Sequence, residues 1–262
     1  MDRRSWLKLS LSGTAALILG TEAPAILLRK EPPKGFRTGL EAIDDYVGCW
    51  DRGDLITFMG TIGAGKTAIA QRIATANAED GHKVIVLADK DELGRWNQIS
   101  SPNLIVKCMP VFDRAIDFGS FLYQQKADLL IMDCEFPVIN EFEFRYVKLY
   151  VARVIAKYAF DLNCSVALTL TTLSKMQWAS SVEPIINSNS ISFTSSRIFK
   201  ITKYGSLSEV KLVKNRDGGR NISFYYRHVL NKGIILPVSV PWWQINTYEL
   251  NKLNTWDTWY GK

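Results

Sequence analysis

Residues 55–70 read LITFMGTIGAGKTAIA: an apolar run, a glycine-rich turn and the start of a helical pattern. The turn matches G-x-x-x-x-G-K-[ST], in which glycines let successive backbone N–H groups point at a phosphate. The helix that follows adds the positive end of its dipole. A strand before the turn and a helix after it are the context that a phosphate-binding loop requires, so we interpret the turn as a nucleotide site.

The pattern assigns a role to each residue of the turn. The expected nucleotide-binding residues are Gly60, Thr61, Ile62, Gly63, Ala64, Gly65, Lys66 and Thr67. Lys66 is expected to reach the β- and γ-phosphates of ATP, and the Thr67 hydroxyl to ligate Mg²⁺. ATP and Mg²⁺ are therefore the expected cofactors.

A candidate acid for the same site ends the apolar run at residues 127–133. A parallel strand delivers its last residue to the carboxyl edge of the sheet, where nucleotides bind. We therefore expect Asp133 to hold the hydration shell of the Mg²⁺ and to act with Lys66 in catalysis.

Composition is that of a folded chain with one sizeable core. The chain has 262 residues, and 47% of them are apolar. The net charge of +6 permits binding to a polyanion without requiring it. The cysteines contain no C-x-x-C pair, so we predict reduced thiols rather than a zinc site or a disulfide framework. They are Cys49, Cys108, Cys134 and Cys164.

Strand and helix patterns alternate after the loop. Strand patterns lie at 83–88, 103–108, 127–133 and 165–170, and helical spacing at 145–162. They predict an α/β fold with a mostly parallel central sheet flanked by helices. From residue 197, short β-patterns separated by tight turns predict an antiparallel C-terminal extension; they lie at 197–202, 208–213 and 222–226.

Three segments are expected: an N-terminal segment and linker at 1–35, the main domain at 36–235 and an aromatic-rich tail at 236–262. The first has paired arginines, a mild apolar stretch and an A-x-A-like site ending at Ala25, the order of a twin-arginine export signal. The apolar run is too short for a stable membrane span. An amphipathic helix that docks on the domain or on a neighbouring subunit is the alternative. Because exported compartments hold little ATP, we expect a cytoplasmic protein, with export as the alternative.

The motifs, taken in order, resemble those of RecA-like P-loop ATPases. Before the loop stand Thr38-Gly39, Ile43-Asp44, Gly48 and Gly53-Asp54, with Cys49 where the family usually has a second glycine. After it, Lys214-Asn215-Arg216-Asp217-Gly218 matches a K-x-R-x-G hairpin. Over roughly residues 36–228 the chain thus resembles the C-terminal ATPase domain of DnaB-type replicative DNA helicases. The resemblance implies a homo-oligomeric ring, usually a hexamer, that acts on single-stranded DNA among replication proteins.

In that family the cations of the hairpin enter the ATP site of the neighbouring subunit. The resemblance therefore implies that Lys214 and Arg216 are catalytic in trans and stabilise charge on the transferring γ-phosphate. The alternative is an ordinary hairpin turn with solvated cations, because Asp-Gly-Gly favours a tight turn.

Two positions depart from the family. The simplest register puts Lys90 where the family has a catalytic Glu, and spacing does not decide whether Asp89, Asp91 or Glu92 substitutes. Thr172 stands where the family has a Gln. Binding of ATP is therefore predicted, but fast hydrolysis is not. The alternative function is a slow or inactive ATP-binding regulatory or loader module that works through protein partners.

Two segments are candidates for contact with single-stranded DNA. The loop at 174–196 would follow the phosphates with Lys175 as its main charge. The tail carries aromatic residues, among them Trp242, Trp243, Trp256 and Trp259, which could stack on bases or anchor the tail to the protein.

Overall fold

The computed structural model describes residues 35–134, 144–171, 194–204, 207–219, 222–229 and 234–237. All of them belong to one compact unit, Pro33–Lys262. The export-like segment, Thr172, Lys175 and the tail beyond residue 237 lie outside the described residues. No helix in the described part is long and apolar enough to cross a membrane.

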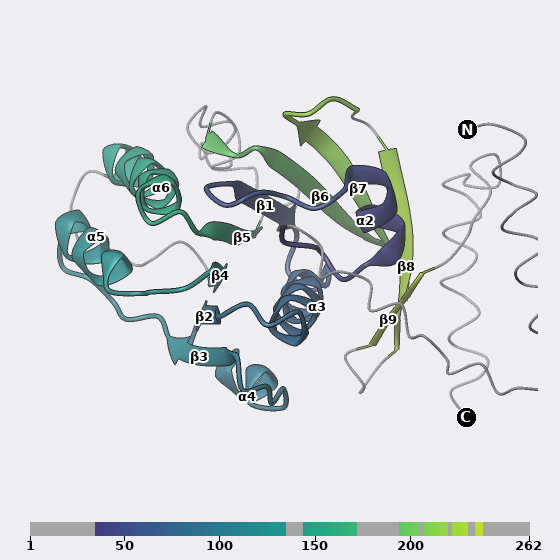
Figure 1. Cartoon of the computed structure of the whole chain (residues 1–262), viewed down its shortest axis with the longest axis horizontal. Helices are drawn as coiled ribbons and strands as arrows, with labels where there is room; N and C mark the ends of the chain where they lie inside the picture. The colour runs from purple at the N-terminus through teal and green to yellow at the C-terminus, as the bar shows by residue number, and fades with distance from the viewer. Residues whose placement is uncertain are drawn as a thin grey trace, which may run out of the picture. The chain divides into compact units, whose positions relative to one another are not determined.

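A single sheet forms the centre of this unit, and its described strands follow the order β3-β2-β4-β5-β1-β6-β7-β8-β9 (Figure 1). Neighbours from β3 to β6 in this order pair in parallel, and those from β6 to β9 pair antiparallel. The predicted α/β fold with a C-terminal antiparallel extension is confirmed. The strands are β1 (Leu55–Gly60), β2 (Val84–Ala88), β3 (Leu104–Cys108), β4 (Leu129–Asp133), β5 (Ser165–Thr171), β6 (Arg197–Tyr204), β7 (Leu207–Asn215), β8 (Ile222–Val229) and β9 (Ile234–Pro237).

Helices cover both faces of the parallel strands, which explains why those strands are continuous apolar runs. Along β1, Ile56 and Phe58 join the core under α3, whereas Leu55 and Met59 join the core under α5 and α6. Figure 1 shows α3 on one side of the strands and α5 and α6 on the other. The helices are α2 (Glu41–Val47), α3 (Lys66–Glu79), α4 (Leu93–Trp96), α5 (Ala115–Tyr123) and α6 (Phe144–Asp161).

The lead-in before β1 is folded onto α3. The carboxylate of Asp44 accepts hydrogen bonds from the backbone and the hydroxyl of Thr38, both at 2.7 Å, and from the Gly39 N–H at 2.9 Å. Gly39 has a φ of +71°, and a Cβ there would lie 2.7 Å from the Cβ of Ala76 on α3. Arg72 donates a hydrogen bond from Nε to the Gly39 carbonyl at 2.8 Å. The T-G and D positions of the lead-in therefore fix the helix that the nucleotide loop opens.

Candidate nucleotide site

The glycine-rich turn joins the end of β1 to the start of α3, as its sequence predicts. Gly63 and Gly65 have φ values of +74° and +98°, in the left-handed region that favours glycine. Gly60 lies so close to β6 that a Cβ would be 2.7 Å from the Ile201 carbonyl oxygen. The Lys66 ammonium donates hydrogen bonds to the carbonyl oxygens of Gly60 at 3.2 Å and Thr61 at 3.0 Å. The lysine therefore lies against the loop whose phosphate it is expected to contact.

The antiparallel part of the sheet also supports the loop. Ala64 is completely buried, and its carbonyl oxygen accepts a hydrogen bond from the Ser208 hydroxyl of β7 at 3.2 Å. Ile62, by contrast, is 78% exposed at the tip of the turn. The loop is thus fixed at its base and open toward solvent, which suits a cradle for a ligand.

Asp133 ends β4 at the same edge of the sheet as the loop. Its carboxyl group is buried, and its Oδ1 accepts a hydrogen bond from the Thr67 hydroxyl at 3.4 Å. The structure thus brings Lys66, Thr67 and Asp133 together, the residues expected to hold ATP and Mg²⁺. No three His, Cys, Asp or Glu side chains in the described ranges form a metal cluster. The residues fit a Mg²⁺ ion that takes most of its ligands from phosphates and water.

Two residues that the sequence did not indicate hold the Asp133 carboxylate. The Thr169 hydroxyl of β5 donates to Oδ1 at 2.9 Å, and the Trp96 indole Nε1 donates to Oδ2 at 3.0 Å. Both side chains are buried. A lone Trp and a Thr within an apolar strand carry no motif, so only the fold could reveal them.

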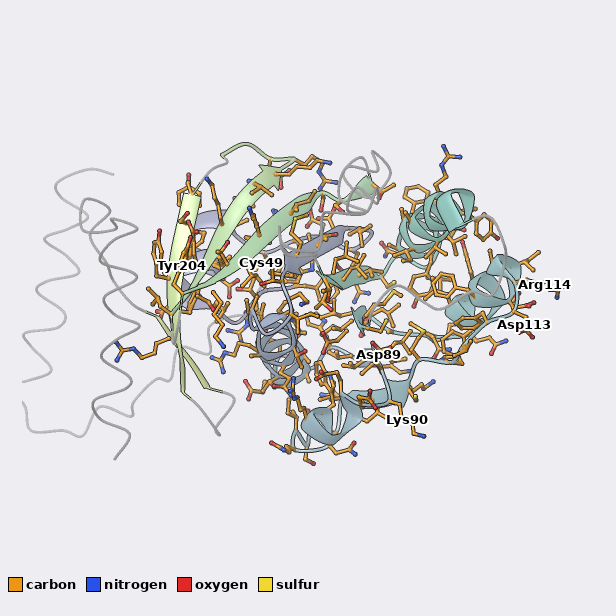
Figure 2. All side chains as sticks on the ribbon, turned by 180° about the vertical axis from the view of Figure 1, so that it is seen from behind. Cys49, Asp89, Lys90, Asp113, Arg114 and Tyr204 are labelled. Carbon is orange, nitrogen blue, oxygen red and sulfur yellow. The ribbon has the colours of Figure 1, made fainter. Side chains whose placement is uncertain are left out.

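The tip of β2 lies beside Asp133, because Ala88 is the register partner of Asp133. Lys90 is exposed and points outward, whereas Asp89 is half-buried (Figure 2). Burial raises the pKa of the Cys134 thiol, and the charges of Asp89 and Asp133 raise it further. Glu92 instead pairs with Arg95 at 3.0 Å. Asp89 is thus the acid of this turn whose charge reaches the residue next to Asp133.

Lys214 and Arg216 lie at the opposite end of β1 from the loop. Lys214 pairs with Ile198 in the register of β6 and β7, near the amino end of β1. Its ammonium donates a hydrogen bond to the Ser195 carbonyl at 2.6 Å, and burial lowers its pKa. Arg216 pairs with Asp54, the residue directly before β1, and the charge of Asp54 raises the arginine pKa. Within one chain, these two cations therefore do not join the nucleotide site.

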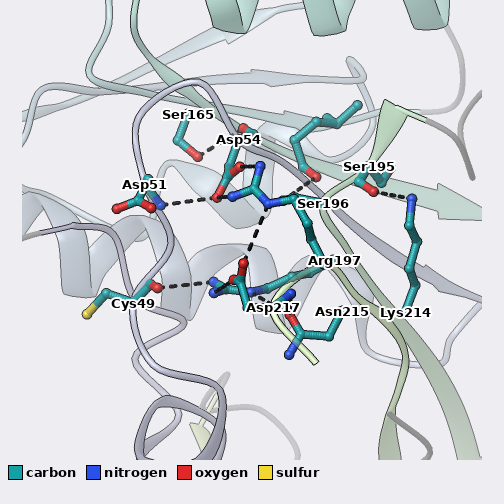
Figure 3. Close-up of polar contacts among 12 residues, drawn as sticks. Cys49, Asp51, Asp54, Ser165, Ser195, Ser196, Arg197, Lys214, Asn215 and Asp217 are labelled. Carbon is teal, nitrogen blue, oxygen red and sulfur yellow. Dashed lines mark hydrogen bonds and ion pairs between the residues drawn. The ribbon is translucent and has the colours of Figure 1, made fainter. Parts of the chain in front are cut away.

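Figure 3 shows the polar network that surrounds these cations. Arg197 is almost fully buried and donates to the Asp217 carboxylate at 2.8 Å and to the Cys49 carbonyl at 3.2 Å. Asp217 also pairs with Arg216 at 3.5 Å. The K-x-R-x-G turn is therefore anchored to the lead-in rather than being a loosely solvated hairpin.

No protein-family model matches the sequence, and a search of curated proteins finds no match. Solved structures do match. The isolated ATPase domain of a DnaB-like helicase is 12% identical with a TM-score of 0.61, over 89% of this chain and 99% of that chain. A DnaB-like replicative helicase, solved in a study of its interactions with primase, is 12% identical with a TM-score of 0.63, over 87% of this chain and 71% of that chain. The RadB recombinase is 14% identical with a TM-score of 0.55, over 74% of this chain and 96% of that chain.

At these identities the likeness shows the fold alone. The chain has the fold of RecA-like P-loop ATPases and resembles the ATPase domain of DnaB-like helicases.

Proposed function

We propose that the chain is an ATP-hydrolysing RecA-type motor domain that acts on DNA as a homo-oligomeric ring, similar to the core of a DnaB-type helicase. One observation carries the proposal: β1 has the phosphate loop at its carboxyl end and the cations Lys214 and Arg216 beside its amino end. A head-to-tail interface places one edge of a subunit against a different edge of the next, and such interfaces close into rings. The two groups on opposite edges are suited to form one shared site at each interface.

The chain's own residues then divide the work. The loop N–H groups and Lys66 bind the phosphates of ATP, with Lys66 exchanging the carbonyl oxygens of Gly60 and Thr61 for phosphate oxygens. Thr67 and Asp133 hold Mg²⁺, which neutralises charge on the β- and γ-phosphates when bound. Lys214 and Arg216 of the partner subunit stabilise the charge that develops on the transferring phosphoryl group.

Mixing two inactive variants tests the shared site. Lys66→Ala removes the loop lysine, and Arg216→Ala removes the arginine of the other edge. In mixed rings, an Arg216→Ala subunit keeps an intact loop and receives an intact Arg216 from a Lys66→Ala neighbour. We expect ATP hydrolysis to recover to a fraction of the wild-type rate on mixing. Arg114→Ala, which breaks an exposed pair with Asp117 on α5, is the control and should hydrolyse ATP like the wild type. If mixing restores nothing while native mass shows mixed oligomers, Arg216 does not act in trans.

A second candidate function is a slow or inactive ATP-binding module that regulates or loads a partner protein. The exposed Lys90 at the tip of β2, where the family has its catalytic Glu, favours it. ATP turnover with and without single-stranded DNA separates the two functions. Strong stimulation by DNA supports the motor and contradicts the module.

The cellular location is also a proposal. We infer a cytoplasmic protein because the proposed reaction consumes ATP. N-terminal sequencing of the mature protein tests this, since cleavage after Ala25 would indicate export instead.

A further inference from the structure

Trp96 connects a short helix to the acid of the nucleotide site. It is the last residue of α4, its side chain is completely buried, and its Nε1 donates a hydrogen bond to Oδ2 of Asp133 at 3.0 Å. The hydroxyls of Thr169 and Thr67 approach the other oxygen, Oδ1, at 2.9 and 3.4 Å. The two oxygens of one carboxylate are thus separated: Oδ2 faces the indole, and Oδ1 faces the end of α3.

The helix that carries Trp96 is itself tied to α3. Gln71 of α3 donates a hydrogen bond from Nε2 to the Arg95 carbonyl oxygen at 3.0 Å. Thr67 belongs to the first turn of α3, one helical turn before Gln71. Through Gln71 and Trp96, α4 is therefore connected both to the helix that supplies Thr67 and to the strand that supplies Asp133.

We propose that Trp96 is a positioning residue for Mg²⁺ binding, a role that rests on the function proposed above. The terminal torsion of an Asp side chain is broad and roughly two-fold, so a carboxylate needs partners to hold one orientation. A buried indole N–H is a donor only, and its hydrogen bond to a carboxylate is charge-assisted. Trp96 thereby keeps Oδ2 engaged and leaves Oδ1 to face Thr67 and the cation. Loss of a residue that orients a metal-binding carboxylate in this way commonly lowers metal affinity by about 10–100-fold.

Trp96→Phe tests the role, because it keeps an aromatic ring and removes the donor. Trp50→Phe is the matched control: Trp50 is equally buried, and its Nε1 has no hydrogen-bond partner within the described residues. The measurement is binding of a fluorescent ATP analogue at a series of Mg²⁺ concentrations. We expect the Mg²⁺ concentration for half-maximal enhancement of binding to rise about tenfold in Trp96→Phe and to stay unchanged in Trp50→Phe. Binding in excess chelator should be alike in all three proteins.

A second measurement needs no change at Trp96 itself. The indole N–H resonance of Trp96, identified by its loss in Trp96→Phe spectra or by selective labelling, should shift in Asp133→Asn and also when Mg²⁺ and the ATP analogue are added to the wild type. An indole signal that neither change moves would overturn the proposal, as would an unchanged Mg²⁺ requirement in folded Trp96→Phe protein. Failure of the function proposed above looks different: Lys66→Ala and wild type would then bind the nucleotide equally well.

Discussion

Arg216 forms an ion pair with Asp54, with 3.0 Å between Nη1 and Oδ1, although the two residues lie 162 positions apart in the sequence. The arginine side chain is 56% exposed, whereas the Asp54 side chain is 4% exposed and also accepts a hydrogen bond from the Asp51 N–H at 3.1 Å. Asp54 directly precedes β1, and β1 ends in the phosphate loop. One strand therefore connects the anchor of the proposed trans-acting cation with the loop that binds the nucleotide.

Asp54→Asn should release this anchor. The substitution keeps the size of the side chain and removes the charge that holds Arg216, so we expect a loss of about 1–3 kcal/mol in the free energy of unfolding. ATP hydrolysis should also fall, because the arginine loses its fixed position at the subunit edge. Urea denaturation and steady-state turnover measure the two effects. Asp117→Asn, which breaks an exposed pair on α5, is the control and should change neither. Unchanged turnover in Asp54→Asn would show that the ion pair does not position Arg216 for catalysis.

Thr169→Val removes the second donor to Asp133 while keeping the shape of the side chain. Without the hydrogen bond at 2.9 Å, Oδ1 loses the partner that fixes it from β5, so we expect hydrolysis to require several-fold more Mg²⁺. The rate as a function of Mg²⁺ concentration measures this. Thr57→Val on the neighbouring β1 is the control, because the Thr57 hydroxyl bonds to Ser195 instead, at 2.8 Å. Equal Mg²⁺ requirements in the two variants would contradict the role of Thr169.

Gly60→Ala should damage the loop through backbone contact. The added Cβ would meet the Ile201 carbonyl oxygen at 2.7 Å, and backbone on a central strand cannot move away cheaply. We expect a loss of about 1–3 kcal/mol in stability, the usual cost of overpacking, together with weaker nucleotide binding. Thermal unfolding and nucleotide titration measure them.

Gly94→Ala is the control for Gly60→Ala, because a Cβ at Gly94 meets nothing within 4 Å and lies in the helix α4. It should leave stability unchanged or slightly higher. If Gly60→Ala bound nucleotide as tightly as Gly94→Ala, the close approach of β1 and β6 would not constrain the loop.

The sequence predicted the elements that carry a local signal. The parallel strands are apolar runs, and the loop has a fixed glycine spacing, so β1, β2, β4 and β5 lie within one or two residues of their predicted positions. Helices α4 and α5 were not predicted. The first is only four residues long, and the second has nine. Too few turns are available there for a helical period to be distinguished from a loop.

The sequence could not predict the partners of the site residues. Thr169 faces Asp133 only because β4 and β5 pair with Met132 opposite Leu168, and that register is a property of the whole sheet. Trp96 reaches the same carboxylate from a helix between β2 and β3. Such contacts depend on the order of strands in the sheet rather than on spacing along the chain. Motifs therefore identified Lys66, Thr67 and Asp133, and the fold identified what holds them.

Asp128 should make stability depend on pH at the start of β4. Burial alone would raise its pKa, but the hydrogen bond from the Lys83 N–H at 2.9 Å and the ion pair with Arg52 at 2.7 Å outweigh burial and lower it. A carboxyl group whose pKa is lower in the folded state stabilises the fold above its unfolded pKa of about 3.9, and this contribution disappears as the pH falls through the folded value.

We therefore expect Asp128→Asn to reduce the free energy of unfolding by about 1 kcal/mol near neutral pH, because the neutral amide keeps the acceptor geometry but loses the charge. The difference from the wild type should shrink below about pH 4 and vanish near the lower pKa of the folded state. Urea denaturation of both proteins across this range measures it. A difference that stays constant from neutral to acidic pH would mean that Asp128 contributes through its shape and hydrogen bonds, and not through its charge.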